Sequence, residues 1–365
     1  MSWVTAWPCR KSCCRQRHSA FHNSLSWLDV GQTISVSPQT PSVVKSPYIY
    51  SRQRRLLGLV GALDGMVENL DFQKLLFLHC KEIESLGEAG QAADLYEFVP
   101  YRYGAFSFTC YSDRRRLVDR GLLANDDQHW VLTETGETIA HEACDVEMRR
   151  FAIRHRGLRG DALIAETYRR YPYFAIRSEI AERVLQNDQG ALRKIAAACP
   201  PRRSARILTI GYERRTLESY LSKLIQSSVT ILCDVRRNAI SRKYGFSKTT
   251  LANACDGVGI RYEHFPELGI ESQRRQGLKT QADVDGLFRC YRRDTLPMQG
   301  HALNRIHSWL RSGQSVALTC YEREASQCHR HCVADALGRR SDPTNVSQQP
   351  VGTLDSEETY IVRHL

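Results

Sequence analysis

The stretch S-V-A-L-T-C-Y-E-R-E-A-S-Q-C-H-R-H-C-V-A-D-A-L, residues 315–337, joins an apolar run to a dense group of reactive side chains. Its pattern predicts a buried strand over 316–319, a polar loop over 321–327 and the first turns of a helix over 328–337. In an open α/β sheet, ligands bind where strands end and helices begin. The stretch therefore predicts a site at this strand end, made of Cys320, Glu322, Cys328, His329 and Arg330.

Two other segments repeat this arrangement of an apolar strand followed by polar side chains. The first, I-L-T-I-G-Y-E at 207–213, predicts a strand, a turn at Gly211 and a helix from about Thr216. The second predicts a strand over 229–233 that runs into D-V-R-R-N at 234–238. Three strands of one sheet would then end in Tyr212 and Glu213, in Asp234 and Arg236, and in Cys320 and Glu322. Such convergence predicts a shared site at one edge of the sheet.

Several short motifs in this region resemble the prokaryotic domain-of-unknown-function family 488. They are T-I-G-Y-E at 209–213, D-V-R-R-N at 234–238, S-R-K-Y-G-F-S-K at 241–248, G-I-R-Y-E-H-F-P-E-L-G-I at 259–270, and C-Y-E with C-H-R within 320–330. The resemblance covers roughly 206–339 and implies an α/β fold of three layers, but it implies little about the reaction. Many relatives have proline where this chain has Ala239, a departure that we expect to loosen the loop without altering the chemistry.

Composition and charge set the outer limits. The chain has 365 residues, enough for two domains, and its net charge of +11 favours a polyanionic partner, with DNA preferred among nucleic acids. Thirteen cysteines, an odd number without regular pairing, fit free thiols in a reducing cytoplasm. No apolar run is long enough to span a membrane, and the first residues do not resemble a secretory signal. The oligomeric state is not predicted.

The region before the α/β domain predicts a mainly helical, winged-helix-like domain over 52–143. Two apolar helices are followed by a basic helix with Arg114, Arg115 and Arg116, and then by a β-hairpin of 122–124 with 130–133. The alternative is a protein-interaction domain whose arginines form a solvated face. We expect a helical linker over 144–203, the α/β domain over 204–340 and a C-terminal tail over 341–365. For residues 1–51 we expect either a disordered tail or a segment that results from translation at an upstream start codon.

The chemistry of the strand ends has three interpretations. Carboxylates at Glu213, Asp234 and Glu322 could activate water or stabilise a cationic sugar, or could form structural ion pairs. Cys328, at a predicted helix start beside His329, is a candidate nucleophile, although buried cysteines are often plain packing residues. We expect the remaining polar and aromatic side chains to bind nucleic acid: Tyr212, Arg236, Arg242, Lys243, Tyr244, His329 and Arg330.

Metal and cofactor motifs are weak in this sequence. Cys320, Cys328, His329 and Cys332 are possible zinc ligands, but three of them lie within five residues and no second C-x-x-C pair completes a known spacing. No phosphate-binding glycine loop, dinucleotide fingerprint or H-E-x-x-H motif occurs. We therefore predict no metal and no cofactor, with a magnesium-dependent nuclease kept as a rival.

Together these features predict a nucleic-acid-processing enzyme that hydrolyses a bond in DNA. Base excision of the N-glycosylase type, with modified phage DNA as one candidate substrate, ranks slightly ahead of strand cleavage. The alternative is a non-catalytic DNA-binding regulator, at a phage-defence locus for example, whose α/β domain senses a ligand.

Overall fold

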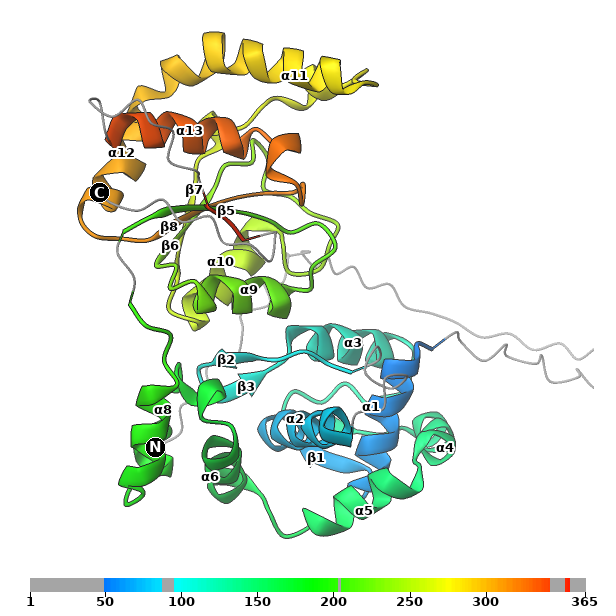
Figure 1. Ribbon diagram of the computed structural model, residues 1–365. Coiled ribbons are helices and arrows are strands. Elements are labelled where there is room, and N and C mark those ends of the chain that lie inside the picture. Colours follow the sequence, from blue (N-terminus) through cyan, green and yellow to red (C-terminus); the bar gives the residue numbers. More distant parts are fainter. Residues whose placement is uncertain (1–48, 87–94, 203–204, 342–351, 355–365) are drawn as a thin grey trace, which may run out of the picture. The chain divides into compact units, whose positions relative to one another are not determined.

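The structure, a computed structural model, describes residues 49–86, 95–202, 205–341 and 352–354. The described residues belong to one compact unit. Within it, a mostly helical region precedes a parallel β-sheet that is flanked by helices (Figure 1). Most of the predicted N-terminal and C-terminal tails lies outside the described residues.

The first region is built from short helices with apolar faces. Its helices are α1 (Ser51–Ala62), α2 (Asn69–Leu86), α3 (Phe108–Asp119), α4 (Glu134–Ala143), α5 (Val146–Arg154), α6 (Gly160–Arg170), α7 (Ala181–Val184) and α8 (Gln189–Ala197). The apolar positions of the first two helices are buried, except that Leu70 is only partly so, and Phe72 of α2 packs against the fully buried Trp130. Ser107 caps α3, where its hydroxyl accepts a hydrogen bond from the Cys110 amide. The three helices predicted first are thus confirmed.

The predicted β-hairpin is only partly correct. Its second arm, β4 (His129–Val131), pairs antiparallel with β1 (Met66–Glu68), a strand between α1 and α2 that the sequence pattern did not indicate. The first arm joins it through one isolated bridge, between Leu123 and Leu132. β1 was missed because three residues give too short a period to recognise. A second small pair is formed by β2 (Val99–Tyr101) and β3 (Gly104–Phe106).

Lys74 is a charged side chain in the centre of this helical core. It is 1% exposed, and its Nζ donates a 2.8 Å hydrogen bond to the carbonyl of Ala105. Burial lowers the pKa of Lys74 from 10.5 to about 7, because the ammonium loses its hydration. As the pH falls from 10.5 to about 7, the unfolded chain takes up a proton that the folded protein resists, so the free energy of unfolding decreases over this range.

We expect Lys74→Met to stabilise the protein. At pH 7 the free energy of unfolding should rise by about 1–4 kcal/mol, since an apolar side chain of similar length removes the desolvation cost. Between pH 7 and 9 its pH dependence should also flatten. Urea denaturation at both pH values measures this. The control is Lys81→Met, a partly exposed lysine of α2 paired with Glu84, which should change the stability by at most about 1 kcal/mol. A stability loss in Lys74→Met would show that the bond to Ala105 outweighs the cost of burial.

The second region contains a parallel sheet with the order β7-β6-β8-β5-β9. Its strands are β5 (Ile207–Gly211), β6 (Ile231–Asp234), β7 (Arg261–His264), β8 (Val316–Cys320) and the two-residue β9 (Gly352–Thr353). Its helices are α9 (Leu217–Gln226), α10 (Lys248–Gly257), α11 (Gln281–Cys290), α12 (Gly300–Arg311) and α13 (Arg330–Ser341). Because all pairs are parallel, the three predicted strand ends lie at one edge. This part of the prediction is confirmed.

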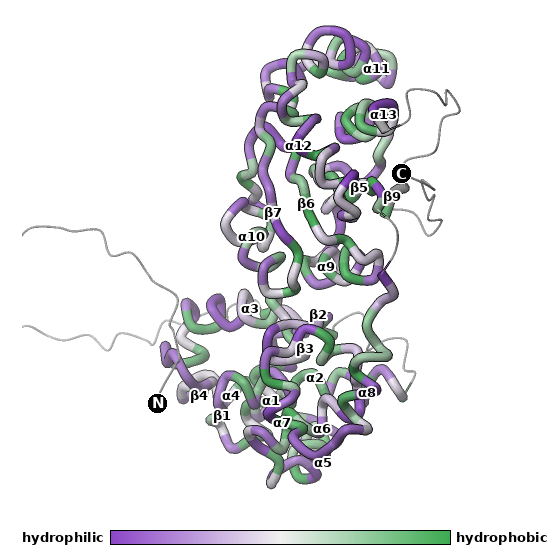
Figure 2. The backbone as a smooth tube through the Cα atoms, turned by 90° about the vertical axis from the view of Figure 1, so that its left-hand side faces the viewer, coloured by the Kyte–Doolittle hydropathy of each residue, from purple (hydrophilic) through white to green (hydrophobic). Residues whose placement is uncertain are grey.

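Helices pack on both faces of this sheet (Figure 1). Leu208, Ile210 and Leu232 belong to a core with α9 and α10. Their neighbours in sequence, among them Ile207, Ile231 and Cys233, belong to a second core with α12 and α13. Strands buried on both faces are expected to be apolar throughout, whereas edge strands are not. Figure 2 shows the contrast, with β6 coloured largely hydrophobic and the edge strand β7 hydrophilic.

The helical region contacts the sheet region through a buried carboxylate. Glu218, in the first turn of α9, is 0% exposed and accepts hydrogen bonds from the Ser107 hydroxyl (3.1 Å) and from the Thr109 amide (2.7 Å). Burial raises the pKa of Glu218, and these donors at the start of α3 oppose the rise. The position of α3 next to the sheet region is therefore set by specific polar contacts. Within the described part of the chain, no helix is long and apolar enough to cross a membrane.

Candidate functional site

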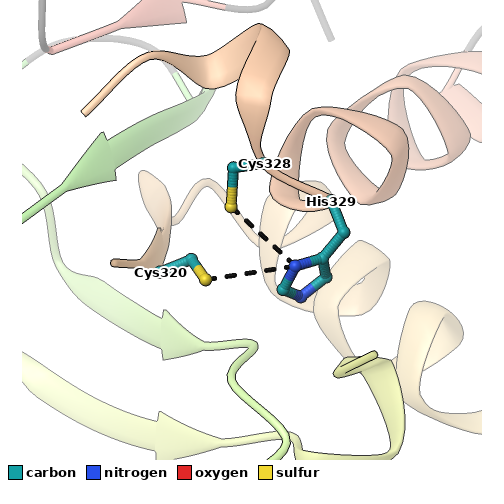
Figure 3. Close-up of side chains that lie close together, drawn as sticks. All are labelled: Cys320, Cys328 and His329. Carbon is teal, nitrogen blue, oxygen red and sulfur yellow. Dashed lines mark hydrogen bonds between the residues drawn. The ribbon is translucent and has the colours of Figure 1, made fainter. Parts of the chain in front are cut away.

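Two thiols and an imidazole meet where β8 ends (Figure 3). Cys320 is the last residue of β8, and Cys328 and His329 lie directly before α13. The sulfur atoms of Cys320 and Cys328 lie 4.0 Å and 3.8 Å from Nδ1 of His329. Each of the three residues is at most 2% exposed. The helix begins at Arg330 rather than at Cys328 as predicted, and Cys328 itself has an extended backbone.

The two thiols differ in acidity. The hydrogen bond from Cys328 lowers the pKa of Cys320 well below its ordinary value, against the effect of burial and with help from His329 and Arg275. Burial raises the pKa of Cys328, and the neighbouring Cys320 raises it further. Of the two thiols, Cys320 is therefore the more acidic, although the sequence favoured Cys328. The predicted helix start was misplaced by two residues, so the helix dipole acts less directly on Cys328 than we expected.

Glu322 lies beside these two thiols. Among the three candidate carboxylates Glu213, Asp234 and Glu322, it is the only one that contacts the thiols in the described structure. Its Oε2 accepts a 3.3 Å hydrogen bond from the Cys320 thiol, and its Oε1 accepts one from Arg275 at 3.2 Å. Burial, followed by the charge of Cys320, raises the pKa of Glu322. Its side chain is still 27% exposed, so solvent reaches the carboxyl group.

The loop that carries Glu322 is held by Arg330 and by close backbone packing. The buried Arg330 donates hydrogen bonds to the carbonyls of Glu322 and Arg323, the second at 2.7 Å. Gly211 of β5 lies so near that a Cβ atom there would meet the Glu322 carbonyl at 1.9 Å. Only glycine fits at position 211. Arg330 was expected to bind phosphate, and the structure places its guanidinium inside the protein instead.

Asp234 and Arg236 form a buried ion pair at the end of β6. Nε of Arg236 donates to Asp234 Oδ1 at 2.8 Å, and its other nitrogens reach Asp234, the Tyr212 hydroxyl and the Phe246 carbonyl. Burial alone would lower the pKa of Arg236, but the hydrogen bonds and charge of Asp234 raise it above its ordinary value. Tyr212 stacks on Phe246, with ring centroids 4.4 Å apart. These predicted site residues are brought together, but as a closed network.

The other predicted residues from these loops are more exposed. Glu213 accepts a 3.0 Å hydrogen bond from the Arg323 amide, which ties the ends of β5 and β8 together. Arg242 is exposed, and Lys243 donates to the carbonyl of Tyr212 at 2.8 Å. Tyr244 accepts a 3.2 Å hydrogen bond from Arg115 of α3. Predicted nucleic-acid-binding residues of the two regions thus meet at this point.

The three consecutive arginines of α3 have different surroundings. Arg114 donates to the carbonyls of Asp126 and His129, the second at 2.7 Å, and lies over the Trp130 ring, so it connects α3 to β4. Arg115 and Arg116 are exposed, and Arg116 lies 3.5 Å from the buried Asp113. The exposed pair is accessible to a partner, whereas Arg114 is used within the fold.

Arg275 belongs to the site and was not predicted. It lies at the end of a single turn, Ser272–Arg275, and its guanidinium reaches both Glu322 and Nδ1 of His329, the latter at 3.0 Å. The sequence shows two adjacent arginines, 274 and 275, and no pattern tells which of them turns inward. Tyr291, whose ring lies 5.8 Å from that of His329, was also missed, because no sequence pattern marks it as a neighbour of His329.

Comparison with known protein families gives a match in the C-terminal part of the chain. Residues 216–337 match the family model described as Domain of unknown function DUF488. The C-terminal part of the chain is a DUF488 domain. The resemblance seen in the sequence is thereby confirmed. The match begins at the cap of α9, so β5, Tyr212 and Glu213 precede it, although β5 pairs with β8 inside the DUF488 domain. No curated protein and no solved structure matches the chain.

Proposed function

We propose that this protein binds nucleic acid, with DNA preferred, and that its DUF488 domain hydrolyses a bond in it. Base excision, the hydrolysis of an N-glycosidic bond, is favoured over strand cleavage. The observation that carries the proposal is the position of Glu322, a partly exposed carboxylate oriented by Arg275 at the carboxyl edge of the sheet. Ligands of open α/β sheets bind at this edge.

The charge around Glu322 supports a polyanionic substrate. The segments that follow the four longer strands each carry at least one exposed arginine: Arg214 after β5, Arg237 and Arg242 after β6, Arg274 after β7 and Arg323 after β8. Guanidinium groups bind phosphate oxygens through paired hydrogen bonds. We assign phosphate binding to these arginines, because Arg236 and Arg330 are buried and bonded within the protein.

The proposed reaction needs one water molecule and one carboxylate. As the bond between the base and the anomeric carbon breaks, its electron pair leaves with the base, which takes up a proton. The proton on the base comes from solvent. Water adds to the anomeric carbon, and Glu322 accepts a proton from that water and then returns it to solvent. The products are the free base and an abasic sugar. In this scheme Asp234 and Glu213 keep the loops in place, and Cys328 is not a nucleophile.

We further propose that the helical region is a nucleic-acid-binding module of winged-helix type and that the DUF488 domain has three layers. Support comes from the pairing of β4 with β1, which places a small sheet beside α3, and from the exposed Arg115 and Arg116 on that helix. The described residues include ten free cysteines. Free thiols fit a protein that acts in the reducing cytoplasm.

The first test compares plain, single-stranded and phage-modified DNA after incubation with the protein, with magnesium or with EDTA. We expect strand breaks that appear only after hot alkali, because abasic sites are alkali-labile. Direct breaks that require magnesium would replace base excision with nuclease activity. Binding of DNA without any break on all three substrates would contradict hydrolysis.

The non-catalytic regulator remains the second candidate, and one observation favours it. A pocket of about 160 Å³ in the DUF488 domain is lined by Tyr291, Arg237 and Arg274 together with the carboxylates Glu267 and Glu271. A small ligand bound there would contact the Tyr291 ring that packs against His329. This candidate predicts sequence-specific duplex binding without turnover, and that outcome of the same assay would support it.

A further inference from the structure

The donor atoms at the end of β8 have the arrangement of a metal site. The two sulfurs and Nδ1 of His329 all lie within 4.8 Å of one another, in the only such group of three found among the described residues. A tetrahedral zinc ion, with Zn–S near 2.3 Å and Zn–N near 2.0 Å, holds such atoms about 3.5–3.8 Å apart. For a sulfur and a nitrogen the expected separation is about 3.5 Å, and the distances of 3.8 Å and 4.0 Å to Nδ1 are slightly longer. Small side-chain movements would close the difference.

The ring of His329 is already oriented for metal binding. Its Nε2 lies 2.8 Å from the carbonyl oxygen of Val235, to which only an N–H can donate. The proton therefore resides on Nε2. Nδ1 faces the two sulfurs (Figure 3) and accepts a hydrogen bond from Arg275 at 3.0 Å. Metal-binding histidines usually donate their second nitrogen to a carbonyl or carboxylate in this way.

Binding of a dication requires the Arg275 guanidinium, 3.0 Å from Nδ1, to release that nitrogen and remain with Glu322; the other surroundings suit the ion. Two thiolates would neutralise the charge of the ion, and the Glu322 carboxylate would be balanced by Arg275, which already contacts it. Cys320 belongs to the sheet, and the Arg330 side chain holds the loop before Cys328. The ligands thus come from a fixed framework, as metal sites require. Glu322, next to Cys320, is the more exposed neighbour, with 27% of its side chain accessible to solvent.

We propose that Cys320, Cys328 and Nδ1 of His329 bind one divalent ion of the zinc class, with the fourth coordination position facing Glu322. Two thiolates and an imidazole select zinc over magnesium or calcium, which prefer oxygen ligands. Cys332, which looked equivalent in the sequence, is not a ligand, because its sulfur lies against His331, at 3.4 Å from Nε2. The inference goes beyond the proposed function and does not depend on it.

The test uses the full-length, reduced protein and needs no activity. The metal-free protein is titrated with Co²⁺, and we expect one equivalent to bind with thiolate-to-cobalt charge-transfer absorption and the visible bands of a tetrahedral ion. Zn²⁺ should displace it and should protect two thiols from alkylation. If the folded, reduced wild-type protein binds neither ion, the proposal is wrong, whatever DNA assays show.

Three variants assign the ligands. Cys328→Ser and His329→Gln should weaken Co²⁺ binding by more than about 100-fold, since each removes one of three ligands. Cys332→Ser is the matched control, a buried cysteine one turn further along the chain, and should bind Co²⁺ as wild type does. Circular dichroism checks that each variant is folded. Charge-transfer absorption that persists unchanged in Cys328→Ser would overturn the assignment.

Discussion

Glu322→Gln is expected to lower the rate of DNA hydrolysis by about 10²- to 10⁴-fold, the usual contribution of a group that accepts a proton in the transition state. Glutamine has nearly the same shape and can still accept the hydrogen bond from Arg275 at 3.2 Å, so the loop and the exposed arginines should stay in place. The dissociation constant for DNA should therefore change little. The measurement pairs single-turnover rates with DNA binding at one fixed salt concentration, because salt alters binding strongly.

A neighbouring carboxylate supplies the control for this variant. Glu324 is exposed, lies two residues further along the same loop and carries the same charge. Glu324→Gln should retain wild-type rates, which separates the role of Glu322 from a general loss of negative charge. Equal rates in Glu322→Gln and wild type would rule out the carboxylate mechanism and leave the proposed metal site unaffected.

The second large effect is expected on stability. Asp234→Asn should lower the free energy of unfolding by about 3–5 kcal/mol, because it leaves the buried Arg236 charge without a counter-ion. The Tyr262 hydroxyl, which donates to Asp234 at 2.6 Å, would also lose a charged acceptor. Urea denaturation of the purified variant measures this loss. Any drop in activity should then follow the fraction of unfolded protein.

Asp256→Asn is the matched control, since Asp256 pairs with Arg102 on the surface and both side chains are exposed. An exposed pair of this kind contributes at most about 1 kcal/mol. A different result for Asp234 is informative as well. If Asp234→Asn were as stable as wild type and inactive, Asp234 would take part in the chemistry, and the structural role given to it here would be wrong.

The sheet and its strand ends were predictable because their signals are local. Apolar runs such as V-A-L-T and I-L-T-I are buried on both faces, and a buried strand must be apolar throughout. Parallel pairing then places all strand ends at one edge, so the meeting of Cys320, Glu322 and Glu213 follows from topology. The N-cap Thr216 was predictable for similar reasons. Gly211, predicted as a turn, is instead the last residue of β5 and pairs with Cys320.

The remaining features depend on contacts between segments that are distant in the chain. Arg275 reaches Glu322 across 47 residues, and Glu218 finds its donors 109 and 111 residues away. No periodic pattern marks such side chains, because an arginine or glutamate on a loop or helix is usually solvated. The pairing of His329 Nε2 with the Val235 carbonyl has no sequence signal either, since every residue offers a carbonyl. The sequence named Cys320, Cys328, His329 and Cys332 as possible zinc ligands, and the structure shows that the first three meet whereas the sulfur of Cys332 lies against His331.

The strand order has a consequence for biosynthesis. β8 lies between β6 and β5, which do not pair with each other, and β8 is the last of the four longer strands to leave the ribosome. Until it emerges, β5 and β6 each have an exposed edge, a state that favours chaperone binding or aggregation. β8 itself ends in Cys320, and Glu322, Cys328 and His329 follow it in the chain. In a nascent chain, these last three groups are therefore made only after the strand that joins β5 to β6.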